Sequence, residues 1–213
     1  MITCGDVLDF IQELAPSELA EEWDNIGLMT GGRKKEVNRI LVCLDPTADA
    51  LSKAEEIRAD LLVTHHSLVF RGMKRVTDDD VTGSRVYFAI SKGICVISAH
   101  TNLDYADSGV NAQLASVLGL NDPEVLGDGP GRVGMLKEKS DIGSFISHVK
   151  TALGVSHVRV AGSASSGVQR VAVFSGSFDD DLDAVKRSGA DVVVTGELKH
   201  HTALDAREAG LCF

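Results

Sequence analysis

The sequence lacks long hydrophobic runs and any recognisable export signal. Its apolar stretches fall short of the roughly 18–20 residues that a membrane-spanning helix needs, so no spanning segment is expected. The N-terminal stretch carries Asp6 and Asp9 where a signal peptide would need positive charge. The four cysteines are scattered and form no CxxC pair. Together these absences predict a cytoplasmic protein whose thiols stay reduced.

Basic residues are scarce too, since 21 Lys and Arg stand against 31 Asp and Glu, for a net charge of −10. Neutralisation of phosphates by basic side chains supplies most of the non-specific affinity for nucleic acids, so nucleic acid is a poor candidate for a partner. The sequence also lacks the GxxxxGK[ST] loop of P-loop nucleotide hydrolases. What remains is an ordinary globular composition, with 44% hydrophobic and 24% charged residues over 213 positions.

The chain contains an internal repeat. Residues 37–64 align without a gap to residues 168–195, at an offset of 131 positions, and 9 of the 28 pairs are identical. Random pairing would give about two identities at average residue usage. Two unrelated βαβ units could share part of this pattern, but an ungapped match from strand to strand favours a duplication.

Apolar periodicity predicts alternating helices and strands. In chain order the expected elements are a helix over 5–15, strands over 39–44 and 60–64 flanking a helix over 47–58, a helix near 83–92, a strand over 94–98 and a helix over 110–118. In the second half, Ser140 is expected to cap a helix that Gly154 closes. Apolar runs that alternate with helices indicate a parallel sheet covered on both faces.

The best boundary between the halves is the segment 121–134, which holds two of the four prolines and four glycines. We therefore expect a first α/β half over residues 1–125 and a second over residues 126–213. Residues 210–213 (GLCF) follow a helix as residues 93–96 (GICV) do in the first half. The second half is thus expected to be cut short at its last strand.

Polar residues of unusual chemistry follow three of the expected strands. His65 and His66 come after the strand 60–64, His100 and Asp104 come after the strand 94–98, and Glu197 comes after the repeat of 60–64. Ligands of open α/β sheets bind at the carboxyl ends of the parallel strands. Imidazoles and carboxylates together suit Zn, Mn, Fe, Co or Ni better than they suit calcium. The sequence therefore predicts a metal site at these strand ends.

The candidate residues differ in the roles that the sequence gives them. His65, His66 and Asp104 are the predicted metal ligands. His100 is a ligand, a partner of a ligand or a structural residue, and Glu197 is a candidate for orienting a ligand or for transferring protons. The remaining histidines are expected to be structural or to lie on a following helix: His148, His157, His200 and His201.

These residues lie in segments that resemble the GTP cyclohydrolase 1 type 2 family, also described as the Nif-three-like dinuclear metal-centre proteins. The resemblance covers essentially the whole chain and is specific because its segments occur in order and at the right spacing. They are 22–28 (EWDNIGL), 64–68 (THHSL), 99–104 (AHTNLD), 108–111 (SGVN) and 195–197 (TGE). Ser67 and Ser108 stand where the family usually has proline and glycine, and neither position supplies a ligand.

The resemblance implies a Nif-three-like fold, with two intertwined, duplicated α/β halves and mostly parallel mixed sheets. It implies a ring-shaped homohexamer and a pair of divalent metal ions, with ligands that fall on His65, His66 and Asp104. The family's two other ligands come from a late Gly-His-x-x-x-Glu motif, which this sequence does not reach before Phe213. A metal centre built from these 213 residues is therefore expected to lack two ligands.

The implied activity is the hydrolytic opening of the guanine ring of GTP with release of formate. His100 and Glu197 are then the candidates for proton transfer, and Arg71 and Lys74 are candidates for contacts to a small anionic or nucleotide substrate. Two alternatives stay open at this stage. One is a non-enzymatic metal-binding or regulatory scaffold, and the other is a two-metal phosphoesterase, because a fold by itself does not fix a function.

Overall fold

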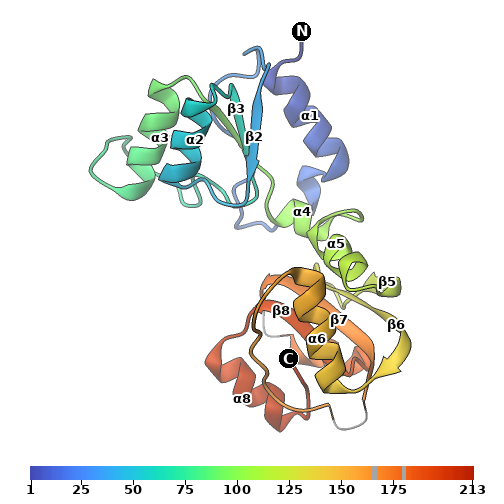
Figure 1. Cartoon of the computed structure of the whole chain (residues 1–213). Helices are drawn as coiled ribbons and strands as arrows, with labels where there is room; N and C mark the ends of the chain where they lie inside the picture. Colours follow the sequence, from blue (N-terminus) through green and yellow to red (C-terminus); the bar gives the residue numbers. More distant parts are fainter. Residues whose placement is uncertain (165–166, 179–180) are drawn as a thin grey trace. The chain divides into compact units, whose positions relative to one another are not determined.

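The computed structural model describes residues 1–164, 167–178 and 181–213, which form two compact units, Met1–Ala106 and Asp107–Phe213. The fold is a mixed α/β fold, as predicted, with two four-stranded mixed sheets and eight α-helices among the described residues (Figure 1). Each sheet takes its strands from its own half of the chain, and within the described ranges no strand is exchanged. Among the helices so described, none is long and apolar enough to cross a membrane.

The first unit is a sheet with the strand order β1-β4-β3-β2. Its strands are β1 (Gly27–Thr30), β2 (Ile40–Cys43), β3 (Leu61–Thr64) and β4 (Cys95–Ser98). The strands β2, β3 and β4 run parallel, and β1 closes the edge antiparallel to β4. Helix α1 (Cys4–Leu14) lies on one side of the sheet, and α2 (Ala48–Glu56) and α3 (Val81–Ser91) lie on the other (Figure 1). The short turn η1 (Ser17–Leu19) and helix α4 (Thr101–Tyr105) complete this unit.

The first sheet is buried on both faces, which explains why the sequences of its strands are continuous apolar runs. Leu61 and Ile97 are buried with Leu8 of α1, whereas Leu62 and Val96 are buried in the cluster that contains α2 and α3. Successive side chains of a strand point to opposite faces, so both faces need apolar residues. The elements predicted from the sequence in this unit agree with the structure to within two residues at each end.

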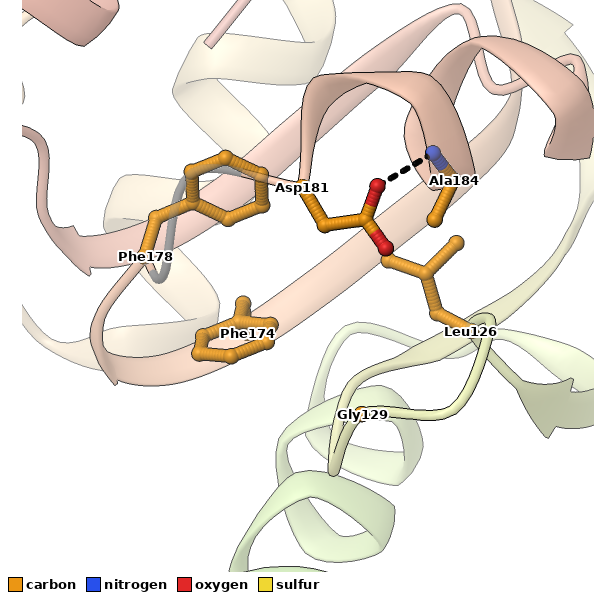
Figure 2. A pocket seen from close by; sticks show the side chains of 6 residues that line it. All are labelled: Leu126, Gly129, Phe174, Phe178, Asp181 and Ala184. Carbon is orange, nitrogen blue, oxygen red and sulfur yellow. Dashed lines mark hydrogen bonds between the residues drawn. The ribbon is translucent and has the colours of Figure 1, made fainter.

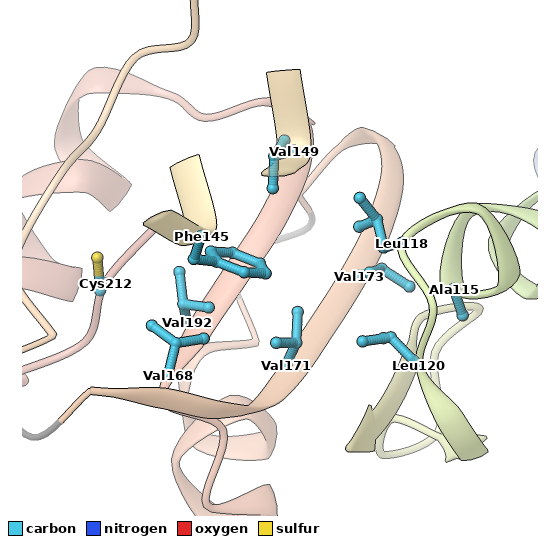
Figure 3. Close-up of a cluster of buried hydrophobic side chains, with 10 residues drawn as sticks. All are labelled: Ala115, Leu118, Leu120, Phe145, Val149, Val168, Val171, Val173, Val192 and Cys212. Atoms are coloured by element: carbon cyan, nitrogen blue, oxygen red, sulfur yellow. The ribbon is translucent and has the colours of Figure 1, made fainter. Parts of the chain in front are cut away.

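The second unit is a sheet with the strand order β5-β6-β7-β8. Its strands are β5 (Asn121–Val125), β6 (Arg132–Ser140), β7 (Val168–Ser177) and β8 (Val192–Glu197), and only the pair β7–β8 is parallel among those described. Its helices are α5 (Val110–Val117), α6 (Ile142–Leu153), α7 (Leu182–Ser188) and α8 (His200–Glu208). Phe145 and Val149 of α6 face the valines of β7 and β8, and Leu118 and Leu120 join the same core (Figure 3).

One local prediction for the second half is wrong, and two of its strands were not predicted. The cap of α6 is Asp141 and not Ser140, because the Asp141 carboxylate accepts the hydrogen bond from the backbone N–H of Ser144, and Gly154 closes the helix in the left-handed conformation as expected. The segment 121–134, rich in proline and glycine, contains β5 and the start of β6. Its glycines serve close packing, since a Cβ at Gly134 would lie 3.0 Å from the carbonyl oxygen of Asn121.

The compact units divide at residues 106/107, whereas the sequence places the boundary between the repeated halves at 125/126. Helix α5 and strand β5 belong to the second unit because Ala115 and the residues that follow it pack into the core beneath α6. The boundary at 125/126 stays a prediction about where the duplicated halves separate.

The repeat seen in the sequence reappears in the pairing of the strands. Ile40 of β2 faces Leu61 of β3, and 131 positions later Val171 of β7 faces Val192 of β8. The next three pairs of each ladder keep the same offset. This identity of register supports a duplication of one βαβ unit, since a slip of one residue would turn every side chain to the opposite face.

A hydrogen-bond pattern at the start of these strands is repeated as well. The Asp60 carboxylate accepts hydrogen bonds of 2.9 and 3.1 Å from the backbone N–H groups of residues 38 and 39. The Asp191 carboxylate accepts hydrogen bonds of 2.8 Å from the N–H groups of residues 169 and 170, at the same offset of 131. We call Asp60 and Asp191 the strand latches, because each ties the start of one parallel strand to its neighbour.

Candidate metal centre

The candidate site lies in the first unit, where two neighbouring parallel strands end. His65 and His66 follow β3, and His100 follows β4, which pairs with β3 through Thr64 and Ser98. The hydroxyl groups of Thr64 and Ser98 lie 2.9 Å apart, and the backbone N–H of Ala99 donates to the carbonyl of Thr64. The two loops therefore leave the sheet side by side, which brings residues 34 positions apart to one edge.

Three imidazoles converge there. One ring nitrogen from each of His65, His66 and His100 lies within 4.8 Å of the other two. The Nε2 atom of His65 is also 3.8 Å from a carboxylate oxygen of Asp104, on α4. Nitrogen and oxygen ligands bind a transition metal at about 2.0–2.2 Å, so donors of one ion lie about 3–4 Å apart. The three imidazoles are therefore a cluster that could hold a metal ion.

Each of the three rings is held through its Nδ1 atom. In every case Nδ1–H donates a hydrogen bond to an oxygen atom. The lone pair of Nε2 in the neutral ring is then available to bind a metal ion. The three hydrogen bonds are His65 to the carbonyl of Ala99 at 3.1 Å, His66 to the carboxylate of Asp45 at 2.7 Å and His100 to the carboxylate of Asp24 at 2.9 Å. Metal-ligating histidines almost always donate their other ring N–H in this way.

Asp24 is the most deeply buried group of the site, with no exposed side-chain surface. Burial alone would raise the pKa of its carboxyl, but hydrogen bonds from His100 and from the hydroxyl and backbone N–H of Thr101 outweigh burial and lower the pKa. Asp24 is therefore a carboxylate that fixes both the ring of His100 and the first residue of α4. That helix carries Asp104, so Asp24 orders two candidate groups at once.

The surroundings of His65 lower the pKa of its imidazole. Burial is the largest influence and lowers the pKa of the imidazole, and the neighbouring rings of His100 and His66 lower it further. The carboxylate of Asp104 opposes this shift. A ring that stays neutral offers its lone pair to a metal ion without first having to release a proton.

The structure brings four of the five predicted site residues together in one unit: His65, His66, His100 and Asp104. Glu197 lies in the second unit, exposed at the end of β8, where it lines a hollow of about 830 Å³ between α6 and β8. His200 and His201 begin α8, as predicted, and the ring of His148 donates to the carbonyl of Leu118 as a structural group.

Sequence reasoning missed Asp24 and Asp45, which hold two of the three rings. A signal for Asp45 was present, because position 176, its counterpart in the repeat, is a glycine. A polar residue at a position where the two copies differ is a candidate for a function that the other copy does not have. Asp24 carries no such signal, since its partners are 76 and 77 positions away.

A second, smaller pocket lies in the second unit (Figure 2). It measures about 20 Å³ and is lined by Leu126, Phe174, Phe178 and a few neighbours. Its single titratable side chain, Asp181, accepts a hydrogen bond of 2.8 Å from the backbone N–H of Ala184 and thereby caps α7. A space of this size holds about one water molecule, so the pocket is a packing feature of the core.

Known proteins resemble this chain along almost its whole length. Residues 2–213 match the family described as Duf34/NIF3 (NGG1p interacting factor 3). A Clostridium perfringens protein named GTP cyclohydrolase 1 type 2 homolog is 35% identical over 214 residues, which cover 97% of this chain and 82% of that protein.

Solved structures show the same fold. A Bacillus cereus protein related to NIF3 has a TM-score of 0.93 and 25% identity, over 99% of this chain and 86% of its own. Reduced HcgD from Methanocaldococcus jannaschii has a TM-score of 0.83 and 33% identity, over 99% and 84% of the two chains. The match along almost the whole sequence and the shared fold establish that this chain belongs to the Duf34/NIF3 family.

Proposed function

We propose that this protein is a metal-dependent hydrolase that uses a pair of divalent ions, held by His65, His66 and Asp104, to open the guanine ring of GTP with release of formate. The observation that carries the proposal is the common orientation of the three imidazoles, each with Nδ1 anchored on an oxygen and Nε2 left available. A purely structural histidine cluster has no need of three rings presented in this way. The names of the relatives supply the reaction.

The chain's own residues have separate tasks in this scheme. Divalent ions, when bound, make water a strong nucleophile near neutral pH and stabilise developing negative charge. His65 and His66 contribute neutral nitrogen donors, and Asp104 contributes a negative oxygen donor that offsets part of the charge of the ions. Because Asp45 holds the ring of His66 and Ala99 holds that of His65, the donors need little reorganisation on binding.

Proton transfer is assigned to His100 and Glu197. The Asp24 carboxylate accepts a hydrogen bond from the ring of His100 and fixes its orientation, as an aspartate does for a catalytic histidine. Glu197 is an exposed carboxylate of the second unit and is the second candidate. Arg71 and Lys74, exposed on the loop after His66, are the proposed contacts for the phosphates of the substrate. The proposed assembly is a ring of six copies.

The decisive experiment measures metal content and formate production in the same preparations. We expect the wild-type protein, loaded with Zn, Mn, Fe, Co or Ni and freed of excess ions, to retain metal and to release formate from GTP. His65→Ala and Asp104→Ala should lose both properties. His157→Ala, which removes an exposed histidine of the second unit, is the matched control and should retain both.

The outcomes separate the alternatives. Metal retention that depends on His65 and Asp104, without turnover of GTP, would contradict the hydrolase and favour a metal-binding scaffold. Release of phosphate instead of formate would favour a two-metal phosphoesterase. Equal metal content in the control and in both site variants would remove the metal centre from the proposal altogether.

A further inference from the structure

Two large aromatic side chains stand exposed beside the histidine cluster. Trp23 is 58% exposed and Phe70 is 45% exposed, and their ring centroids are 5.7 Å apart. Each centroid lies 6.2 Å from that of the His100 ring. Aromatic residues make up only 5% of the chain, and Trp23 is its single tryptophan. Two exposed aromatic rings side by side at the rim of a polar site form a candidate surface for binding a ligand.

The loop that carries Trp23 is held by polar contacts of the two residues that follow it, Asp24 and Asn25. Asp24 is fixed by His100 and Thr101, as described above. The side-chain amide of Asn25 donates to the carbonyl of Val69, directly before Phe70. The loop that carries Trp23 is thereby tied both to the candidate metal centre and to the loop that carries Phe70. Rings on loops held this way lose little conformational entropy when a ligand binds between or upon them.

The rings of Trp23 and Phe70 are not stacked face to face on each other. Trp23 and Phe70 approach the His100 ring at interplanar angles of 74° and 75°, in edge-to-face contacts. They are inclined to each other by 58°, so they do not cover each other's faces as stacked rings would. Aromatic faces bind the flat rings of nucleobases with little dependence on sequence, because every base has a π-face.

We propose that Trp23 and Phe70 form a receptor for the flat ring of the substrate, a purine or a similar nitrogen heterocycle, and position that ring beside His100. The assignment of a heterocyclic substrate to this site rests on the proposed function, whereas the receptor itself is a property of the two side chains. Trp23 and Phe70 are positioning residues, and their contribution is binding of the ring and not the chemistry of its opening.

The single tryptophan makes the proposal directly measurable. We expect GTP and guanosine to quench the fluorescence of Trp23 in a saturable way, both in metal-loaded protein and in protein stripped of metal by a chelator. Tripolyphosphate, which has no ring, should leave the fluorescence unchanged. Phe70→Leu should weaken guanosine binding by about tenfold, the scale of one base–aromatic contact.

A matched control is the same substitution at Phe10, a phenylalanine of α1 that is 58% exposed and makes no ring contact among those described. Phe10→Leu should bind guanosine as the wild type does. The receptor would be refuted by equal effects of the two substitutions, by quenching with tripolyphosphate alone or by the absence of any response to guanosine. Fluorescence that changes with protein concentration and not with guanosine would assign the two rings to an interface between copies.

These experiments test the receptor separately from the proposed hydrolase activity. Guanosine binding that persists in His66→Ala, together with failure of the wild type to release formate, would uphold the receptor and contradict the hydrolase. Release of formate with an unchanged KM in Phe70→Leu and Trp23→Leu would uphold the hydrolase and contradict the receptor.

Discussion

The two copies of the βαβ unit share a scaffold but not a chemistry. In the first unit β2 and β3 pair in the register that β7 and β8 repeat 131 positions later, and the strand latches Asp60 and Asp191 occupy equivalent places. The two copies differ at the end of this strand, since the first copy has His65 and His66 directly after β3 where the second has Gly196 and Glu197 as the last residues of β8. Register and latch hold the strands together, whereas the residues at the strand end are free to differ.

Packing explains why the second copy cannot carry the same pair of histidines. A Cβ atom at Gly196, the counterpart of His65, would lie 2.8 Å from the carbonyl oxygen of Gly176. Gly176 itself stands where the first copy has Asp45, whose carboxylate holds the ring of His66. The same two positions thus form a polar site in one copy and a close backbone contact in the other.

The largest effects, on metal binding and on formate release, are expected from substitutions at the carboxyl end of the second strand of each copy. His66→Ala removes a donor from the candidate centre, and we expect the affinity for the metal to fall by more than the factor of about 10–100 that loss of an outer partner causes. Glu197→Gln, at the equivalent place in the second copy, should lower formate release and leave the metal content unchanged. Elemental analysis and formate assays on both variants test this, and a loss of metal in Glu197→Gln would contradict the division of roles.

The next largest effect is expected from Asp45, which lies in the loop between β2 and α2 and has a glycine as its counterpart in the second copy. Asp45→Gly gives the first copy the residue of the second, and it removes the 2.7 Å hydrogen bond that orients His66. We expect metal affinity to fall by about 10–100-fold while the fold is retained. Competition with a metal-binding dye measures the affinity, and circular dichroism checks the fold. Asp49→Gly, on the exposed side of α2, is the control for a loss of acidic charge. An unchanged affinity in Asp45→Gly would show that His66 needs no orienting partner.

The strand latches should behave alike. Asp60→Asn and Asp191→Asn each weaken two backbone hydrogen bonds to a carboxylate, and each should reduce the free energy of unfolding by about 1–3 kcal/mol. The backbone N–H of Asn38 is the main cause of the lowered pKa of Asp60. A depressed pKa in the folded state stabilises the protein above the ordinary value of 3.8 and ceases to do so as the pH falls through the folded value.

Urea unfolding at neutral and at acidic pH tests the latches. The difference between wild type and Asp60→Asn should shrink as the pH is lowered below 3.8, the ordinary carboxyl value. Two variants that differ strongly from each other at neutral pH would show that the latches are equivalent in geometry only.

The smallest effect is expected from a helix cap in the first copy. The Thr47 hydroxyl accepts a hydrogen bond of 3.1 Å from the backbone N–H of Ala50 at the start of α2. Thr47→Ala should lower the free energy of unfolding by about 1 kcal/mol, and Thr47→Ser should largely preserve it. Neither change should alter metal content, because the cap lies at the N-terminus of a helix and supplies no donor. Thermal unfolding of the two variants provides the measurement.

The sequence predicted much of the site because its residues lie next to strand ends that apolar periodicity reveals. His65 and His66 follow a clear strand, and Asp104 lies in the predicted run after the next strand, so the topology of a parallel sheet brings them together. The antiparallel strands β5 and β6 escaped prediction because proline and glycine in 121–134 indicate turns more strongly than strands. Local propensity gave way there to pairing with β7.

Composition and pattern alone determined the duplication, the alternation of helices and strands and the identity of the paired histidines. Only the tertiary structure decided which distant groups serve them: the buried carboxylate of Asp24 on His100, that of Asp45 on His66 and the meeting of Trp23 with Phe70. The reason is physical. Periodicity records which face of an element is buried, but contacts between loops depend on where the chain returns in space, and no local pattern encodes that return.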